Sequence, residues 1–161
     1  MIKLLKIEWL KIKSYTGFIL LSSFFALGVL TLNYIVYAFK KNVIDKVQAS
    51  QWLFSSSPFD FDAVWKTVSY YGSYFLMLPA LLMVILISNE FNYKTHRQNI
   101  IDGWSRFEFL KVKIAMALVF AVGSTLVIII TALLFGFASG TSFSLNGFET
   151  VGYFMLKALT Y

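Results

Sequence analysis

The sequence predicts an all-α integral membrane protein. Of its 161 residues, 58% are apolar and 14% are charged, whereas a soluble domain carries about 25% charged residues. No Asp, Glu, Lys, Arg or His occurs in residues 14–39, 67–89 or 114–148. Each run exceeds the roughly 20 residues that a helix needs to cross a bilayer. We therefore expect three transmembrane helices, preceded by an interfacial helix, with a short cytoplasmic helix between the second and third and the start of a fourth.

Residues 1–13 alternate bulky apolar and basic side chains. At about 100° per residue, four apolar side chains share one arc of a helix. They are Ile2, Leu5, Trp9 and Ile12. This pattern predicts a helix that lies in the headgroup layer with its lysines toward anionic lipid. The alternative is that 1–13 is only the basic flank that orients the first span, and both can hold. The apolar run that follows is too long for a cleaved signal peptide.

The first span is expected over residues 14–39, with Tyr15 near one end and Tyr34 and Tyr37 near the other. Tyrosines at both ends are typical of an aromatic belt at the two membrane surfaces. A more polar extracytoplasmic connection follows over residues 40–66. A plain linker is the preferred interpretation of this connection, with contact to a substrate as the alternative.

The second span is expected over residues 67–89. Asp60 or Asp62 is placed to cap its N-terminus, because a carboxylate there accepts amide hydrogen bonds and complements the helix dipole. Pro79 lies within the run. A proline inside a helix removes one backbone bond and clashes with the preceding turn, so we expect a kink near Pro79.

The third span is expected over residues 114–138. Gly136 and Gly140 near its end are spaced for close helix approach. Residues 150–161 predict the beginning of a fourth span, and the chain gives no terminating signal after it. The sequence therefore reads as part of a longer protein.

Orientation follows from Lys and Arg counts in the flanks of the spans. Residues 1–13 and 90–113 together carry nine of the 14 basic residues, and the opposite side carries five. The predicted location is the cell (cytoplasmic) membrane, as a multi-pass protein with its N-terminus and residues 90–113 in the cytoplasm.

Residues 90–113 predict a compact elbow. Ser105 and Glu108 form an S-x-x-E capping box, and Trp104 and Phe109 take the two positions of a hydrophobic staple. The third helix therefore begins in the cytoplasm, before the membrane. Gly103 just upstream can adopt the left-handed conformation that makes a tight turn, and one or two helical turns fit between residues 95 and 101.

The elbow resembles the cytoplasmic segment after the second span in permeases of ABC-2 type transporters. The resemblance covers the interfacial helix and all three spans, and it is nearest to bacitracin- and lantibiotic-exporter permeases. Lys94 stands where that family often has glycine, and His96-Arg97 where an apolar-acidic pair is common. The matching positions are Glu90, Thr95, Gln98, Gly103, Ser105, Arg106, Glu108 and Lys113.

The resemblance implies a permease subunit of an exporter in which the elbow contains the coupling helix that contacts a cytoplasmic ABC ATPase subunit. ATP and Mg would be bound by that subunit, and this chain would bind no cofactor. Such permeases have six spans and pair as homo- or heterodimers, so the chain is either a fragment or a half-length subunit. The expected coupling residues are Glu90, Thr95, Arg97, Gln98, Gly103, Ser105, Arg106 and Glu108.

The composition of the spans limits the possible functions. An ionisable group at the bilayer centre costs roughly 2.5–3.5 kcal/mol or more, and none lies in the three predicted spans. A proton relay inside them is therefore excluded, and any vectorial work must be driven through the elbow. His96 is interpreted as a solvated loop residue, and no metal site, catalytic residue or nucleic-acid partner is predicted. A non-transporting membrane interaction or assembly protein is the alternative, and a membrane enzyme is disfavoured.

Overall fold

A computed structural model describes residues 2–39, 41–42, 59–95, 101, 105–140 and 142–161. In these ranges the regular structure consists of six long α-helices, without a β-strand, as the all-α prediction requires. The helices are α1 (Ile2–Lys13), α2 (Thr16–Phe39), α3 (Phe61–Ser73), α4 (Met77–Asn92), α6 (Arg106–Ala138) and α7 (Glu149–Thr160).

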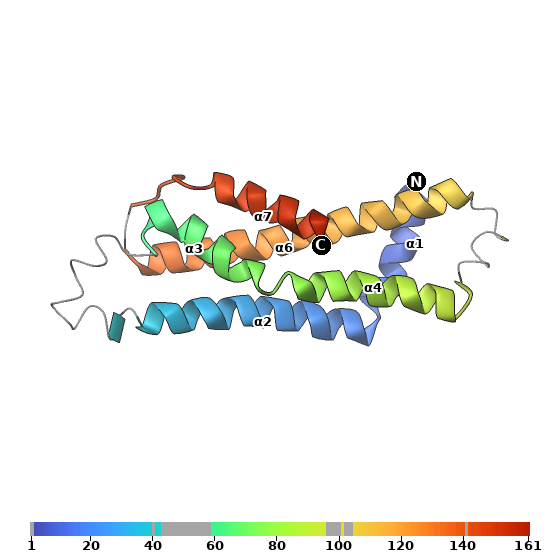
Figure 1. The fold of residues 1–161 in the computed structure, drawn as a ribbon, viewed down its shortest axis with the longest axis horizontal. Coiled ribbons are helices and arrows are strands. Elements are labelled where there is room, and N and C mark those ends of the chain that lie inside the picture. The colour runs from blue at the N-terminus through green and yellow to red at the C-terminus, as the bar shows by residue number, and fades with distance from the viewer. Residues whose placement is uncertain (1, 40, 43–58, 96–100, 102–104, 141) are drawn as a thin grey trace.

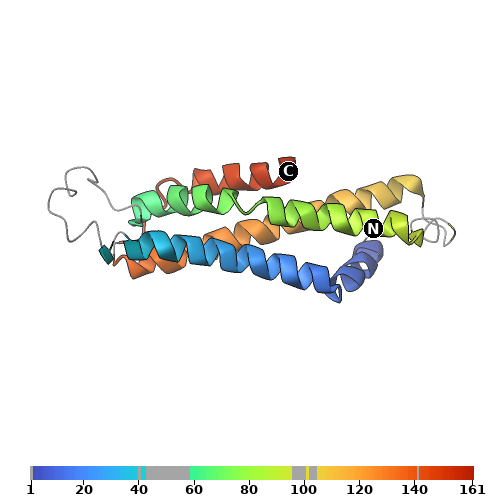
Figure 2. The same cartoon turned by 60° about the horizontal axis from the view of Figure 1, so that its bottom comes forward.

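The helices form an elongated bundle (Figures 1 and 2). α2 lies beside α4, and α6 runs along most of the bundle's length. α3 and α7 pack on the C-terminal half of α6 at one end, whereas α1 crosses the opposite end near the start of α6. The end of α4 and the start of α6 lie at the same end as α1. We call this end the α1 end.

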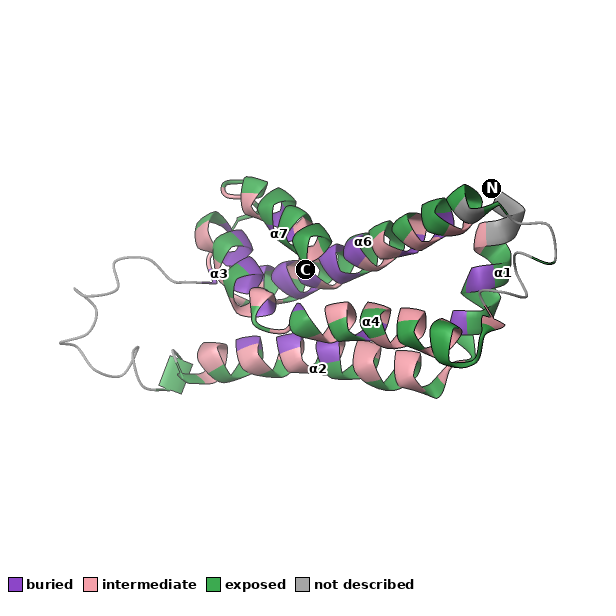
Figure 3. Ribbon diagram, turned by 45° about the vertical axis from the view of Figure 1, so that its right-hand side comes forward, coloured by how far each residue is buried: buried purple, intermediate pink, exposed green. Residues whose placement is uncertain are grey.

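Two helices are long and apolar enough to cross a membrane: α2, with a mean hydropathy of 2.0, and Phe107–Ala138 of α6, with 2.7. Only 17% and 33% of their most apolar windows are buried within the chain, and Figure 3 shows the remaining exposed and half-buried positions. Apolar side chains exposed along a whole helix fit a surface that faces lipid or another subunit. The length and apolar composition of these helices support the prediction of a membrane protein.

The second predicted span is a bent pair of helices. α3 and α4 together have the length and apolarity of a third span, but they meet at 43°. α3 begins at Phe61, before the expected start at residue 67, and therefore includes Asp62 and Lys66. Asp60 takes the N-cap position without a capping bond from its side chain, while Asp62 accepts a hydrogen bond of 2.8 Å from Asn146.

The predicted kink near Pro79 is present as the break between Ser73 and Met77, just before that residue. Pro79 is the third residue of α4. A continuous helix would bring its ring against the carbonyl of Phe75, four residues earlier, whereas in the first turn of a new helix its missing amide needs no acceptor. At the break, backbone hydrogen bonds to the third preceding residue replace the α-helical bonds to the fourth. One example is Phe75 N, which donates to Gly72 O at 3.0 Å.

The hydrophobic core lies away from the α1 end, where α3 packs on α2, α6 and α7. Trp65 is 2% exposed, and its ring nitrogen donates to the Ser144 carbonyl at 3.0 Å. Gly136 allows a close approach here, because a Cβ at this position would lie 2.7 Å from Cε1 of Phe61. Gly140 does not pack in this way: it has a φ of +73° and has open space where a Cβ would be.

Candidate functional site

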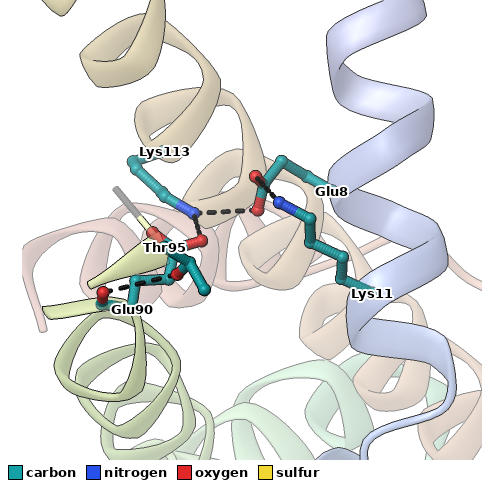
Figure 4. Close-up of polar contacts among 5 residues, drawn as sticks. All are labelled: Glu8, Lys11, Glu90, Thr95 and Lys113. Carbon is teal, nitrogen blue, oxygen red and sulfur yellow. Dashed lines mark hydrogen bonds and ion pairs between the residues drawn. The ribbon is translucent and has the colours of Figure 1, made fainter. Parts of the chain in front are cut away.

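Three helices meet at the α1 end through one lysine (Figure 4). Lys113 of α6 donates to Glu8 Oε2 of α1 at 2.8 Å and to Glu90 Oε1 of α4 at 2.5 Å. Lys11, one turn after Glu8, lies with its Nζ 3.4 Å from Glu8 Oε1. We call Glu8, Lys11, Glu90 and Lys113 the ion-pair cluster.

The ion-pair cluster is largely shielded from solvent. The exposed fraction of the side chain is 2% for Glu8, 12% for Lys113 and 13% for Glu90, against 46% for Lys11. Two carboxylates and two ammonium groups balance in charge, which a shielded site requires because an unpaired buried charge is costly. Lys113 therefore links α6 to both α1 and α4 through charged hydrogen bonds.

Glu8 stays ionised in this environment. Burial raises the pKa of Glu8, but the hydrogen bond and charge of Lys113, together with Lys11, outweigh burial and hold that pKa below its ordinary value. The carboxylate is therefore a permanent partner for Lys113 at neutral pH.

Local sequence explains how each side chain reaches the cluster. Glu8 and Ile12 are one helical turn apart and are both buried. Glu90 lies in the last turn of α4, next to Asn89, whose amide donates to the Tyr15 hydroxyl at 3.1 Å. Lys113 follows Val112, which is 1% exposed and faces the bundle.

The described ends of the elbow are held by hydrogen bonds. Thr95 Oγ1 donates to the Glu90 carbonyl at 3.3 Å. Ser105 forms the predicted capping box: its hydroxyl accepts from the Glu108 amide at 3.1 Å, and its amide donates to Glu108 Oε2 at 3.0 Å. Lys94 has a φ of +55°, a left-handed conformation that glycine adopts without steric cost.

Part of the predicted site falls outside the described residues. Arg97, Gln98 and Gly103 belong to the undescribed stretches, as do Trp104 of the predicted staple and His96. Arg106 is the first residue of α6, but its side chain is not described, and the same holds for Ile2 in α1. The structure therefore brings together Glu90, Thr95 and Lys113, and separately Ser105 and Glu108.

The predicted apolar arc of α1 does not present one uniform face. Ile12 is 5% exposed and packs inward, whereas Trp9 is 40% exposed and meets the Phe18 ring edge-on, with centroids 6.0 Å apart. Leu5 is half-buried. The helix is therefore docked on the bundle through Glu8 and Ile12 and keeps part of Trp9 available for lipid.

Sequence reasoning missed Glu8 as a site residue. One signal was available: Glu8 is the single acid of residues 1–13 and falls at the edge of the apolar arc, beside Ile12. A carboxylate at the border of an inward face predicts a cationic partner. Its partner, Lys113, entered the prediction only as a matching position of the family resemblance.

The cluster borders a cavity of about 240 Å³. Its walls combine the ion pairs with Tyr15, Leu86, Tyr93 and Thr95. Within the described ranges, no three His, Cys, Asp or Glu side chains are grouped as metal ligands. The arrangement places charged side chains between α1, α4 and α6. Such side chains can connect the helices and can contact a ligand in the cavity.

Comparison with known proteins returned no matching family model, no matching curated protein and no matching solved structure. In the described part of the chain, two helices are able to cross a membrane, or three segments if the bent pair forms one span. The function is therefore inferred from the geometry of the α1 end.

Proposed function

We propose that the chain is a membrane-spanning permease subunit of an ATP-driven ABC exporter for a hydrophobic or amphipathic substrate such as a peptide antibiotic, a lipid or a drug. The observation that carries the proposal is that the residues of the ABC-2 resemblance bond to one another. Glu90 pairs with Lys113, Thr95 bonds the Glu90 backbone, and Ser105 and Glu108 cap α6. The residues of the resemblance thus stabilise the two described ends of the elbow.

A rigid α6 supports transmission of movement. The helix has 33 residues from Arg106 to Ala138, or about 50 Å at 1.5 Å per residue. Its capping box fixes where it begins, so a displacement of the elbow would move the whole helix. Because Lys113 is bonded to Glu90 and Glu8, a movement of α6 would also move α4 and α1.

The proposal places two proteins beside this chain. A cytoplasmic ABC ATPase subunit would receive the elbow, including Arg97, Gln98 and Arg106, and would bind ATP and Mg. A second permease subunit would complete the translocation path. Lipids would contact α1 and the exposed faces of the apolar helices. The alternative, a non-transporting assembly protein, needs neither nucleotide nor a moving elbow.

The test compares two glycine substitutions in the complex with a candidate ATPase subunit. Gly103→Val forces a β-branched side chain into the predicted left-handed turn, which such residues strongly disfavour. Gly123→Val is the matched control, because Gly123 lies within α6 with open space where a Cβ would be. The measurements are the amount of ATPase retained on the purified chain and ATP hydrolysis by the complex in lipid.

Gly103→Val is expected to remove most of the retained ATPase and its stimulated hydrolysis, while Gly123→Val preserves both. Equal amounts of both variants in the membrane would show that insertion is intact. Wild-type coupling in Gly103→Val would overturn the role of the elbow. Failure of any ATPase subunit to bind the wild-type chain would favour the assembly protein.

A further inference from the structure

A second polar cavity lies far from the ion-pair cluster, between α3 and α7. It is a groove of about 530 Å³, the larger of the two. The two helices run side by side there, at the end of the bundle opposite α1 (Figure 1). Its lining residues are Lys66, Thr67, Ser69, Tyr70, Tyr71, Ser73, Thr150, Tyr153, Phe154 and Lys157.

The groove is positively charged. Lys66 comes from α3 and Lys157 from the last turn of α7, and no carboxylate is among the described lining residues. The stem of Lys66 is held over Gly147, since a Cβ there would lie 3.2 Å from Lys66 Cε. The nearby carboxylate of Asp62 is bonded to Asn146 instead. Two ammonium groups on one groove favour an anionic ligand.

Hydroxyl groups form the second feature. Ser69 is 5% exposed, and its buried Oγ has no hydrogen-bond partner. Its neighbours differ: Ser73 Oγ donates to the Ser69 carbonyl at 2.8 Å, and Thr150 Oγ1 donates to the Gly147 carbonyl at 2.6 Å. A buried hydroxyl without a partner is unusual in a folded protein. A turn about its Cα–Cβ bond would let Ser69 donate to an acceptor in the groove.

Aromatic side chains form the third feature. Tyr70 and Tyr153 are 62% and 63% exposed, and Phe154 contributes a buried apolar wall. Tyrosines of this kind concentrate where lipid headgroups meet hydrocarbon. The groove therefore combines cationic groups, a hydroxyl donor and apolar surface, which matches a molecule with an anionic head and an apolar body.

We propose that the groove between α3 and α7 binds an anionic phospholipid, with the headgroup phosphate between Lys66 and Lys157 and the acyl chains along the apolar surface beside Tyr70 and Tyr153. Ser69 donates to a phosphate oxygen. The proposal needs only a membrane and this groove, so it is independent of any ATPase partner.

The experiment measures which lipid stays bound to the purified full chain. The chain is equilibrated in neutral detergent with equal phosphatidylglycerol and phosphatidylcholine, and retained lipid is counted by native mass spectrometry. Because each lysine near a lipid surface contributes about fivefold, wild type should prefer phosphatidylglycerol by about 25-fold. Lys66→Gln with Lys157→Gln should abolish this preference, and Lys157→Gln alone should reduce it about fivefold.

Two controls separate charge in the groove from charge elsewhere. Lys66→Arg with Lys157→Arg keeps both charges and should keep the preference. Lys111→Gln removes an exposed lysine near the start of α6 and should leave the preference unchanged. A double Gln variant with wild-type preference, or an equal loss in Lys111→Gln, would overturn the proposal. Displacement of the lipid by inorganic phosphate at equal concentration would also overturn it, by identifying a site for a free anion.

Discussion

Lys113 is the residue on which the α1 end depends. Its ammonium group lies 2.8 Å from the carboxylate of Glu8 and 2.5 Å from that of Glu90. Losing one partner of a buried ion pair typically costs about 3–5 kcal/mol. Without Lys113, Glu8 would keep, among the described residues, only its longer contact of 3.4 Å with the half-exposed Lys11. The fold of this end is therefore conditional on charge, unlike the apolar core around Trp65.

The charge of Glu8 makes stability depend on pH. Since Lys113 and Lys11 hold the pKa of Glu8 below the ordinary value of 4.5, its contribution is fully present above that value and is lost as pH falls through the lower pKa of the folded state. Glu8→Gln should therefore lower the free energy of unfolding by about 1.5–3 kcal/mol at neutral pH, as expected for a hydrogen bond to a charged group. The difference from wild type should shrink as the pH falls below 4.5.

Thermal unfolding of the two proteins in detergent, followed by circular dichroism across this pH range, measures the difference. Glu149→Gln is a suitable control, because Glu149 is exposed in the first turn of α7 and surface substitutions usually change stability by no more than about 0.5 kcal/mol. A Glu8→Gln deficit of constant size at every pH would show that packing, and not charge, holds α1.

At the scale of helices, local signals and tertiary contacts contribute differently. The start of α6 depends on a local motif, the capping box of Ser105 and Glu108. The break between α3 and α4 lies at Tyr74 to Leu76, just before Pro79. Leu76 is 1% exposed at this break and belongs to the core. Burial of apolar side chains there offsets the lost helical bonds.

Removing the cap tests the first of these signals. Ser105→Ala deletes the hydroxyl that accepts from the Glu108 amide at 3.1 Å, so it should destabilise the start of α6 by about 0.5–2 kcal/mol. Faster hydrogen exchange of the amides in the first turn of α6 measures the loss. Ser142→Ala, at an exposed position outside the helices, should leave exchange in that turn unchanged. Unaltered exchange in Ser105→Ala would mean that other contacts fix the helix start.

The whole molecule has two chemically different ends. One end holds the apolar core and the lysine and tyrosine groove, and the other holds the ion-pair cluster and the elbow. α1, the end of α4 and the start of α6 share that second end (Figure 1). This grouping agrees with the basic-residue pattern, which predicts that residues 1–13 and 90–113 lie on one side of the membrane.

Cysteine labelling tests which side is which. The chain has no Cys, so single cysteines report without background. Ser142→Cys, in the connection from α6 to α7, should react with an impermeant thiol reagent in intact cells, and Asn92→Cys, at the end of α4, should react only after permeabilisation. Both positions are exposed in the structure. The reverse pattern would place the elbow outside and would contradict the predicted orientation.

Sequence alone determined the features that depend on neighbouring residues. Apolar runs located the two long helices, and the S-x-x-E pattern located the start of α6. These signals act within one helix, so composition and spacing are enough to predict them. The elbow's boundary residues were predicted in the same way, although its middle lies outside the described residues.

Only the tertiary structure decided the features that join distant parts of the chain. Glu8 and Lys113 are 105 positions apart, and nothing in the spacing of either residue specifies the other. The helix break at Tyr74 and the groove between α3 and α7 likewise depend on which helices pack together. Packing and charge pairing depend on which residues lie close in space. The order of residues along the chain shows only which residues are close in sequence.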